Sequence, residues 1–302
     1  MKKNNSKAEK VLVIGGANID YIGKCKSEIV KQDSNIGSIT ISFGGVGRNI
    51  VENLARLGMD VTFITAIGND SLGNLMLKEL LDLNVKVIMP ENINGNSGGY
   101  LAIHSQKGDM ELALCDQSIT ESISKEFLES KEDIINKFEY IVLDTNFSES
   151  VLEYLINKYS SKKIFIDAIS TAKGKKIIRM SQKISYLKCN ELEAETLFGE
   201  NYFENFKENM LIVTKGSKTI EYNKGNKICF SIVKPLDASA IVNATGAGDA
   251  FFSGFICGKL LNKTNEEALE MGKRMARLTL LSIGAVNKNI NINDICGEDN
   301  DN

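Results

Sequence analysis

The chain alternates short apolar runs with segments of helical periodicity, and this alternation most limits the folds open to it. The runs at residues 11–15 and 61–67 are too short for helices and suit buried strands, while residues 47–58 place Ile50, Leu54 and Leu57 on one helical stripe. Strands that alternate with helices predict a mostly parallel sheet covered on both faces. We therefore expect an α/β fold with three layers, helices on either side of a sheet.

The same rhythm continues through most of the sequence. Predicted strands cover residues 11–15, 61–67, 140–144, 163–169, 186–190 and 210–214, and residues 220–234 predict a β hairpin. Predicted helices cover residues 47–58, 71–83, 149–159, a short segment that ends at residue 180, 192–198, 246–261 and 266–283.

Two segments, approximately residues 22–43 and 97–115, depart from the rhythm with alternating polar and apolar residues and a turn at residues 107–109. We expect them to form a small separate sheet that acts as a lid. With 302 residues, 43% of them hydrophobic, the chain suits one domain over residues 1–302.

Charge and cysteine content exclude several classes of protein. The net charge of −3 gives no field that attracts nucleic acid or an anionic membrane. The six cysteines form no CxxC pair, and with His104 as the single histidine there is no zinc set. The polar start and the lack of about 18 consecutive apolar residues predict no signal peptide or membrane span. We expect a cytoplasmic protein with reduced thiols.

Residues 243–254 carry the clearest chemical signal. Gly246, Ala247 and Gly248 let the backbone approach a ligand at the start of a predicted helix, whose N–H groups and dipole favour a phosphate. Asp249 lies in the first helical turn, where it can accept a proton from an attacking hydroxyl. This arrangement suits phosphoryl transfer. The alternative is a glycine-rich turn before a core helix, with Asp249 only stabilising the helix start.

Further polar clusters follow predicted strands, where open α/β sheets bind ligands. Asn18 and Asp20 follow the first strand, and Gly44, Gly45 and Asn49 surround the start of the next helix. Amides and carboxylates of this kind bind vicinal hydroxyls. Each cluster could also be a turn whose polar groups satisfy one another.

Two further polar clusters lie in the second half of the chain. Asn190 and Glu193 share one side of a helix start, although ordinary helix capping explains the pair equally well. Thr214, Lys215 and Gly216 form a strand end and turn that could hold phosphate.

Taken together, these motifs resemble those of the ribokinase family, also called PfkB carbohydrate kinases, over nearly the whole chain. The resemblance implies a ribokinase-like three-layer αβα sandwich with a small β-sheet lid. It implies that Asn18, Asp20, Gly44, Gly45 and Asn49 bind a sugar. It also implies an anion hole at Gly246, Ala247 and Gly248, and a catalytic base at Asp249.

The resemblance further implies ATP and Mg²⁺ as cofactors. Asn190 and Glu193 correspond to a motif near Mg²⁺, with Glu193 acting through water, while Thr214, Lys215 and Gly216 correspond to the nucleotide-binding strand end. Lys273 and the turn at residues 284–285 are expected to flank the adenine. Family members that need K⁺ carry an aspartate where this chain has Asn243, and Lys288 replaces a helpful serine. Dependence on a monovalent cation is therefore doubtful.

Within the family, residues 43–58 and 188–197 resemble those of bacterial pseudouridine kinases. Arg48 would be available for a base carbonyl or a phosphate, or it forms a salt bridge on its helix. Tyr100 could stack on a base or join a contact between lids, and Asp116 and Lys173 are weaker pocket candidates.

These features predict an ATP-dependent kinase of a nucleoside 5′-hydroxyl, with pseudouridine as substrate. The alternatives are a kinase of a free sugar such as ribose or fructose, a kinase of adenosine or uridine, and a non-catalytic nucleoside-binding regulator. The expected partners are the nucleoside, ATP and a second copy bound through the lid sheet, with neither nucleic acid nor membrane.

Overall fold

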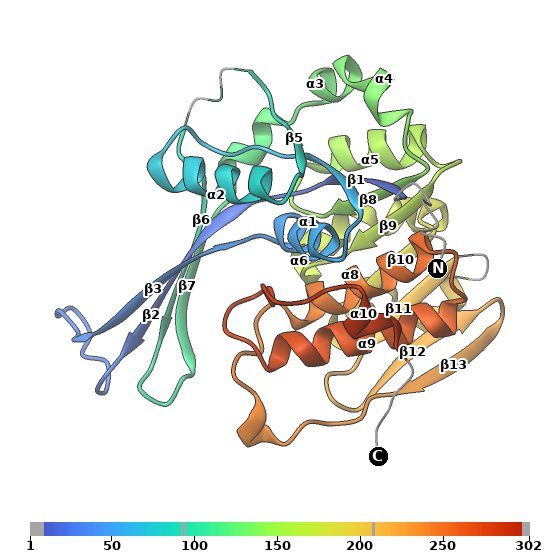
Figure 1. Cartoon of the computed structure of the whole chain (residues 1–302). Coiled ribbons are helices and arrows are strands. Elements are labelled where there is room, and N and C mark those ends of the chain that lie inside the picture. The colour runs from blue at the N-terminus through green and yellow to red at the C-terminus, as the bar shows by residue number, and fades with distance from the viewer. Residues whose placement is uncertain (1–8, 92, 94, 207–208, 298–302) are drawn as a thin grey trace, which may run out of the picture.

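The computed structural model describes residues 9–91, 93, 95–206 and 209–297. Within this part, one nine-stranded sheet has the order β13-β12-β11-β10-β9-β8-β1-β4-β5, and a four-stranded sheet has the order β3-β2-β6-β7 (Figure 1). The strands of the large sheet are β1 (Lys10–Ile14), β4 (Asp60–Ile64), β5 (Lys86–Ile88), β8 (Tyr140–Asp144), β9 (Lys163–Asp167), β10 (Tyr186–Asn190), β11 (Met210–Thr214), β12 (Thr219–Lys224) and β13 (Lys227–Ile232). All neighbours from β5 to β11 are parallel, and β12 and β13 are antiparallel.

Helices cover both faces of this sheet. They are α1 (Val46–Arg56), α2 (Ser71–Asp82), α3 (Lys125–Ser130), α4 (Glu132–Ile135), α5 (Glu149–Lys158), α6 (Thr171–Gly174), α7 (Glu191–Phe198), α8 (Ala247–Leu260), α9 (Asn265–Leu280) and α10 (Asn293–Cys296). Short 3₁₀ segments are η1 (Ser118–Ser122), η2 (Lys175–Lys183), η3 (Tyr202–Asn205) and η4 (Ala238–Ala240).

Side chains of each strand alternate between the two faces of the large sheet, so each face has its own hydrophobic core. In β1, Val11 and Val13 belong to one hydrophobic core, while Leu12 and Ile14 belong to another. Successive strand side chains point to opposite faces, so a strand that is apolar throughout is buried on both. The first core packs against α1, α2, α8 and α9, and the second against α5 and α7. The predicted three-layer α/β sandwich is confirmed.

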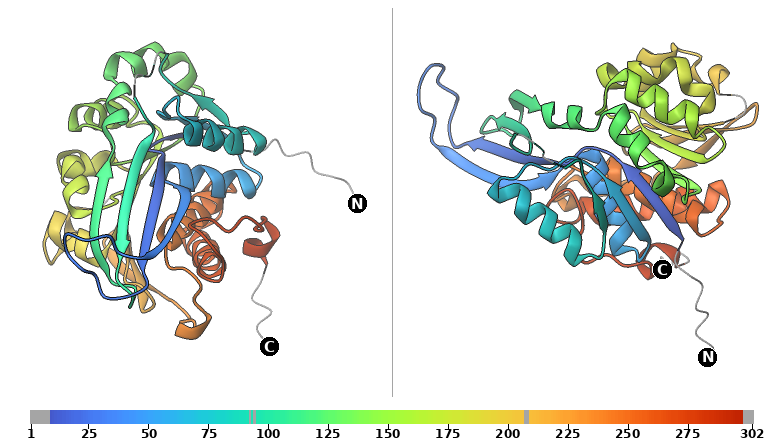
Figure 2. Two further views of the ribbon diagram at one scale, coloured as in Figure 1. Left: turned by 90° about the vertical axis from the view of Figure 1, so that its left-hand side faces the viewer. Right: turned by 90° about the horizontal axis from the view of Figure 1, so that it is seen from above.

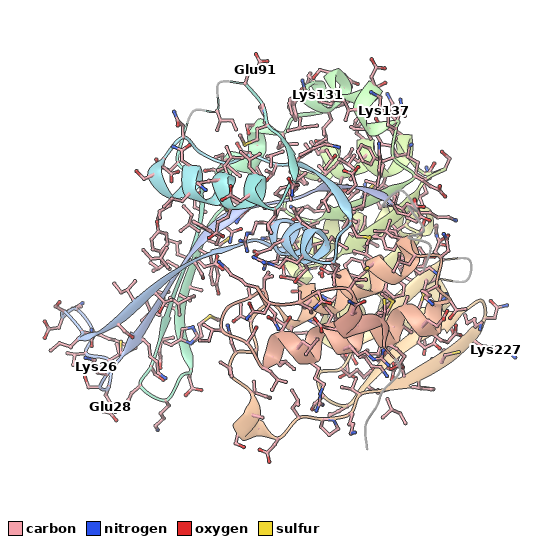
Figure 3. The ribbon with its side chains drawn as sticks, in the orientation of Figure 1. Lys26, Glu28, Glu91, Lys131, Lys137 and Lys227 are labelled. Atoms are coloured by element: carbon pink, nitrogen blue, oxygen red, sulfur yellow. The ribbon has the colours of Figure 1, made fainter. Side chains whose placement is uncertain are left out.

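The small sheet comprises β2 (Asn18–Cys25), β3 (Gly37–Gly44), β6 (Gly98–His104) and β7 (Met110–Asp116). It is mixed, because β2 pairs with β3 antiparallel and with β6 parallel. Figures 1 and 2 show it projecting from the body of the molecule, and Figure 3 places Lys26 and Glu28 at its far end. Large apolar side chains on the small sheet are exposed to solvent, including Ile39, which is 77% exposed, and Leu114, which is 67% exposed.

Most predicted elements are present within a few residues of their expected ends. The segment at 22–43 differs, since β2 already begins at Asn18 and a loop separates it from β3. The sequence before residue 180 forms mainly the 3₁₀ segment η2 rather than an α-helix. Short elements such as β5, α3 and α4 were not predicted, because three to six residues carry too little periodicity. No helix in the described residues is long and apolar enough to cross a membrane.

Candidate active site

Asn18 and Asp20 lie where the small sheet joins the body of the molecule. The Asn18 Nδ2 donates to Asp20 Oδ1 at 2.8 Å, and Gln117 Nε2 donates to Asn18 Oδ1 at 3.1 Å. Burial raises the pKa of Asp20 to about 6, although the Asn18 hydrogen bond and the Arg48 charge oppose this shift. The pair presents a carboxylate and an amide whose orientations are fixed before any ligand binds.

Gly44 and Gly45 are required at the neighbouring turn. A Cβ on Gly44 would collide with the Asp20 carboxylate, and one on Gly45 would lie 2.7 Å from Asn18 Oδ1. Gly45 also has φ of +94° at the start of α1, a conformation that favours glycine. The two glycines therefore let the backbone come close to Asn18 and Asp20.

Asn49 connects this group to residues 200 positions further along the chain. Its Nδ2 donates to Asp249 Oδ2 at 2.8 Å, which joins α1 to the first turn of α8. Burial is the main cause that raises the pKa of Asp249 to about 7, and the nearby Asp167 raises it further. Lys188 and the Asn49 hydrogen bond act in the opposite direction. Asp249 is thus a carboxylate that can gain or lose a proton near neutral pH.

The turn before α8 has the form expected of an anion site. Gly246 has φ of +79°, and a Cβ there would collide with the backbone carbonyl of Ala285. Ala247, Gly248 and Asp249 are the first helical residues, whose N–H groups have no acceptors within the helix. These donors and the helix dipole favour a negative group. The contact also places the turn at 284–285 beside the start of α8.

Lys188 and Asp167 were not among the predicted site residues. Lys188 Nζ donates to Asp167 Oδ2 at 2.7 Å, and the lysine is only 8% exposed. A Cβ on Gly248 would lie 3.1 Å from Lys188 Nζ, so the ammonium lies directly beside the anion turn. Although burial lowers it, the Asp167 carboxylate raises the pKa of Lys188 above its usual value. The one sequence signal that could have revealed Lys188 is that it is a charged residue inside an otherwise apolar strand.

Asp144 was also missed. At the end of β8, its carboxylate accepts from Gly16 N at 2.7 Å, from Gly47 N at 3.0 Å and from Asn146 N at 3.0 Å. Burial raises its pKa. Asp144 therefore ties the turn after β1 to the start of α1, which fixes Asn18 relative to Asn49.

The predicted nucleotide-side residues lie at the ends of β10 and β11. Asn190 and Glu193 form a capping box at the start of α7, with both reciprocal bonds at 2.8 Å. Burial raises the pKa of Glu193. Thr214 donates to the Cys189 carbonyl at 3.3 Å. Gly216 has φ of +60° with open space around its Cα.

Two predicted lysines of this group are held by ion pairs. Lys215 contacts Glu191 at 2.8 Å and Glu221 at 2.7 Å. Lys273 contacts Glu270 at 2.7 Å and donates to the Ile232 carbonyl at 2.7 Å. The nucleotide-binding roles of both lysines stay predictions. To contact a nucleotide, each lysine would either keep its carboxylate partner or exchange it for the nucleotide. The described residues contain no group of three His, Cys, Asp or Glu side chains arranged for direct metal binding.

Arg48 was expected either to be available for a substrate or to form a salt bridge on its helix. The residue is 3% exposed and pairs with Glu52 at 2.5 Å and Glu79 at 3.4 Å. Its NH1 also donates to the Phe43 carbonyl at 3.2 Å. These partners favour the alternative that Arg48 forms a salt bridge. The salt bridge is buried and does not lie on the surface. A direct substrate contact stays a prediction.

The other pocket candidates are dispersed. Tyr100 is half-buried in β6 and pairs in register with Asp20 on β2. Asp116 is exposed at the end of β7, where it accepts from Ser118 N at 2.9 Å. Lys173 Nζ donates to Asn146 Oδ1 at 2.6 Å, close to the turn after β1.

The two positions that made dependence on K⁺ doubtful, Asn243 and Lys288, both have partners within the protein. Asn243 Oδ1 accepts from Thr245 N at 2.9 Å, as in an Asx turn, and Lys288 Nζ contacts Glu79 at 3.4 Å. These contacts do not test the cation prediction.

Comparisons with known proteins show the family to which the chain belongs. The model of the pfkB family carbohydrate kinases matches residues 8–292. The chain is 32% identical over 259 residues to pseudouridine kinase from Escherichia coli, covering 81% of this chain and 82% of that protein. It is 27% identical over 299 residues to guanosine-inosine kinase from Exiguobacterium acetylicum, covering 90% of this chain and 95% of that protein.

 

The chain is also similar to solved structures over nearly its whole length. A carbohydrate kinase from Agrobacterium tumefaciens superposes with a TM-score of 0.82 at 27% identity, covering 95% of each chain. The chain therefore belongs to the pfkB family of carbohydrate kinases and is a phosphotransferase of that family.

Proposed function

We propose that the protein is an ATP-dependent kinase that phosphorylates the 5′-hydroxyl of a nucleoside, with pseudouridine as its substrate. The hydrogen bond from Asn49 to Asp249 at 2.8 Å carries this proposal. It joins the polar group at Asn18 and Asp20 to the carboxylate beside the anion turn of α8. A ribose bound by the first group would direct a hydroxyl toward the second.

Asp249 would accept the proton of the attacking hydroxyl. Its pKa of about 7 leaves a large fraction ionised at neutral pH and makes it a better proton acceptor than an ordinary aspartate. The N–H groups at Ala247 and Gly248 would stabilise charge on the transferring phosphoryl, and the Lys188 ammonium lies beside them. Positioning of the two reactants supplies much of the remaining acceleration.

The residues present fit ATP and Mg²⁺. The N–H groups of Gly248 and Asp249 have no acceptor within the helix and could bind phosphate oxygens, and a Cβ on Gly216, which follows β11, would have nothing within 4 Å. Thr214, Lys215 and Lys273 would contact the nucleotide, while Glu193 would hold Mg²⁺ through water. When bound, Mg²⁺ neutralises charge on the phosphate oxygens. The expectation that stimulation by a monovalent cation is doubtful belongs to the same proposal.

The small sheet would close over the ribose and exclude water, which limits wasteful hydrolysis of ATP. Its exposed apolar side chains, such as Ile39 and Leu114, support a homodimer formed through this sheet. A cytoplasmic location is part of the same proposal.

Similarity to pseudouridine kinase and to guanosine-inosine kinase supports a nucleoside over a free sugar. ATP consumption measured with and without pseudouridine tests the activity. We expect rapid consumption only with the nucleoside, and a 5′-phosphate as product. Binding of pseudouridine without any ATP consumption would instead support the non-catalytic regulator.

The pH dependence of kcat/KM provides a further prediction. Asp249 acts only when ionised, so kcat/KM should rise with pH through about 7. Lys188→Met removes a charge that lowers the pKa of Asp249, so this rise should move upward by about one pH unit. Lys86→Met, which removes an exposed ion pair with Asp60, is the control. An unchanged profile in Lys188→Met would show that the lysine does not act on Asp249.

A further inference from the structure

The side-chain amides of Gln117 and Asn146 both lie close to Gly16, beside Asn18. A Cβ on Gly16 would lie 2.7 Å from Asn146 Nδ2 and 3.3 Å from Gln117 Oε1. Gln117 follows β7, and Asn146 follows β8. Neither residue was among the predicted site residues. Any larger residue at position 16 would collide with the Asn146 amide and crowd the Gln117 amide.

The orientation of each amide is fixed by its other partner. Asn18 donates through Nδ2 to Asp20, so its Oδ1 accepts from Gln117 Nε2. This bond leaves Gln117 Oε1 on the side of Gly16. Lys173 can only donate, so Asn146 Oδ1 faces its ammonium and Nδ2 faces Gly16. The result is an acceptor and a donor side by side.

Gln117 Oε1 is buried and has no hydrogen-bond partner among the described residues. A buried acceptor without a partner costs about 1–3 kcal/mol. Asn146 Nδ2 lies near the Asp144 carboxylate, which leaves the second hydrogen of its NH₂ group for another acceptor. The site therefore suits a ligand that supplies an N–H to Gln117 and a carbonyl to Asn146.

We propose that Gln117 and Asn146 recognise the edge of the nucleobase and select pseudouridine over uridine. This inference rests on the proposed function. Gln117 bonds to Asn18, so a ribose held by Asn18 and Asp20 places its base beside the amide pair. Pseudouridine would donate N1–H to Gln117 Oε1 and accept from Asn146 Nδ2 through its C2 carbonyl. Uridine, superposed on it, offers a carbonyl but a C5–H in place of N1–H.

Kinetics with the two nucleosides test this selection. The wild-type kcat/KM should favour pseudouridine over uridine by about 10- to 100-fold, because uridine leaves Gln117 Oε1 unpaired. Gln117→Met removes the acceptor, so this ratio should fall toward one. The variant also loses the bond to Asn18, but that loss affects both nucleosides equally. Glu121→Gln, an exposed change in η1, is the matched control and should keep the wild-type ratio.

The outcomes separate this inference from the proposed function. Turnover of pseudouridine with no preference over uridine in the wild type, or with the same preference in Gln117→Met, would overturn the inference alone. No turnover of any nucleoside would overturn both. If Gln117→Met fails to fold in a thermal-unfolding measurement, the wild-type comparison of pseudouridine with uridine still decides.

Discussion

Asp249→Asn is expected to lower kcat by about 10³-fold or more while leaving the KM for the nucleoside nearly unchanged. Asparagine has almost the same shape and can still bond to Asn49, but it cannot accept the proton of the attacking hydroxyl. The carboxylate lies 2.8 Å from Asn49 Nδ2, in the first turn of α8, where the proposed mechanism needs a proton acceptor. Steady-state kinetics with saturating ATP would measure both constants.

A stability measurement separates loss of chemistry from loss of fold. Burial raises the pKa of Asp249 to about 7 in the folded protein, above its value in the unfolded chain. The folded state therefore holds its proton more tightly, and the carboxylate lowers stability as pH rises from about 4 through 7. Asp249→Asn should be at least as stable as wild type at pH 8, with a difference that shrinks toward pH 4. Substantial remaining kcat in a folded variant would remove Asp249 from the role of base.

Gly246→Ala is expected to lower kcat by about 10²-fold or more and to lower the Tm. The added Cβ meets the backbone carbonyl of Ala285, and φ of +79° is unfavourable for alanine. Rotating a side chain cannot relieve a collision with backbone, so the turn and its N–H donors must move. Kinetics and thermal unfolding of the same variant would show both effects.

Gly58→Ala is the matched control for this substitution. Gly58 also has positive φ, +83°, but nothing lies within 4 Å of its added Cβ. It should cost about 1 kcal/mol of stability and leave kcat unchanged. Equal kcat in the Gly246 and Gly58 variants would contradict the anion-turn assignment.

The sequence predicted those features that depend on local pattern. Apolar runs such as Val11 to Ile14 indicated buried strands, and the glycine turn before Asp249 indicated a helix start suited to an anion. Both signals lie within a few residues, where side-chain spacing and glycine placement decide the conformation.

Contacts between distant residues could not be predicted in the same way. The bond between Asn49 and Asp249 spans 200 positions, and nothing local to either residue specifies it. The pair of Lys188 and Asp167 could not be predicted, because Asp167 lies on a neighbouring strand, 21 positions away in the sequence. A salt bridge on its own helix was one of the two expectations for Arg48, but its second partner, Glu79, comes from α2. Pairing of this kind depends on the packing of elements and not on their sequence pattern.

Side-by-side measurement of kcat/KM for pseudouridine, uridine, adenosine, ribose and fructose tests the central claim most directly. The arrangement of Asn18, Asp20, Asn49 and Asp249, with the amide pair beside Asn18, predicts the highest kcat/KM for pseudouridine. It predicts a 5′-phosphate as the product. A strong preference for ribose or fructose would contradict the account.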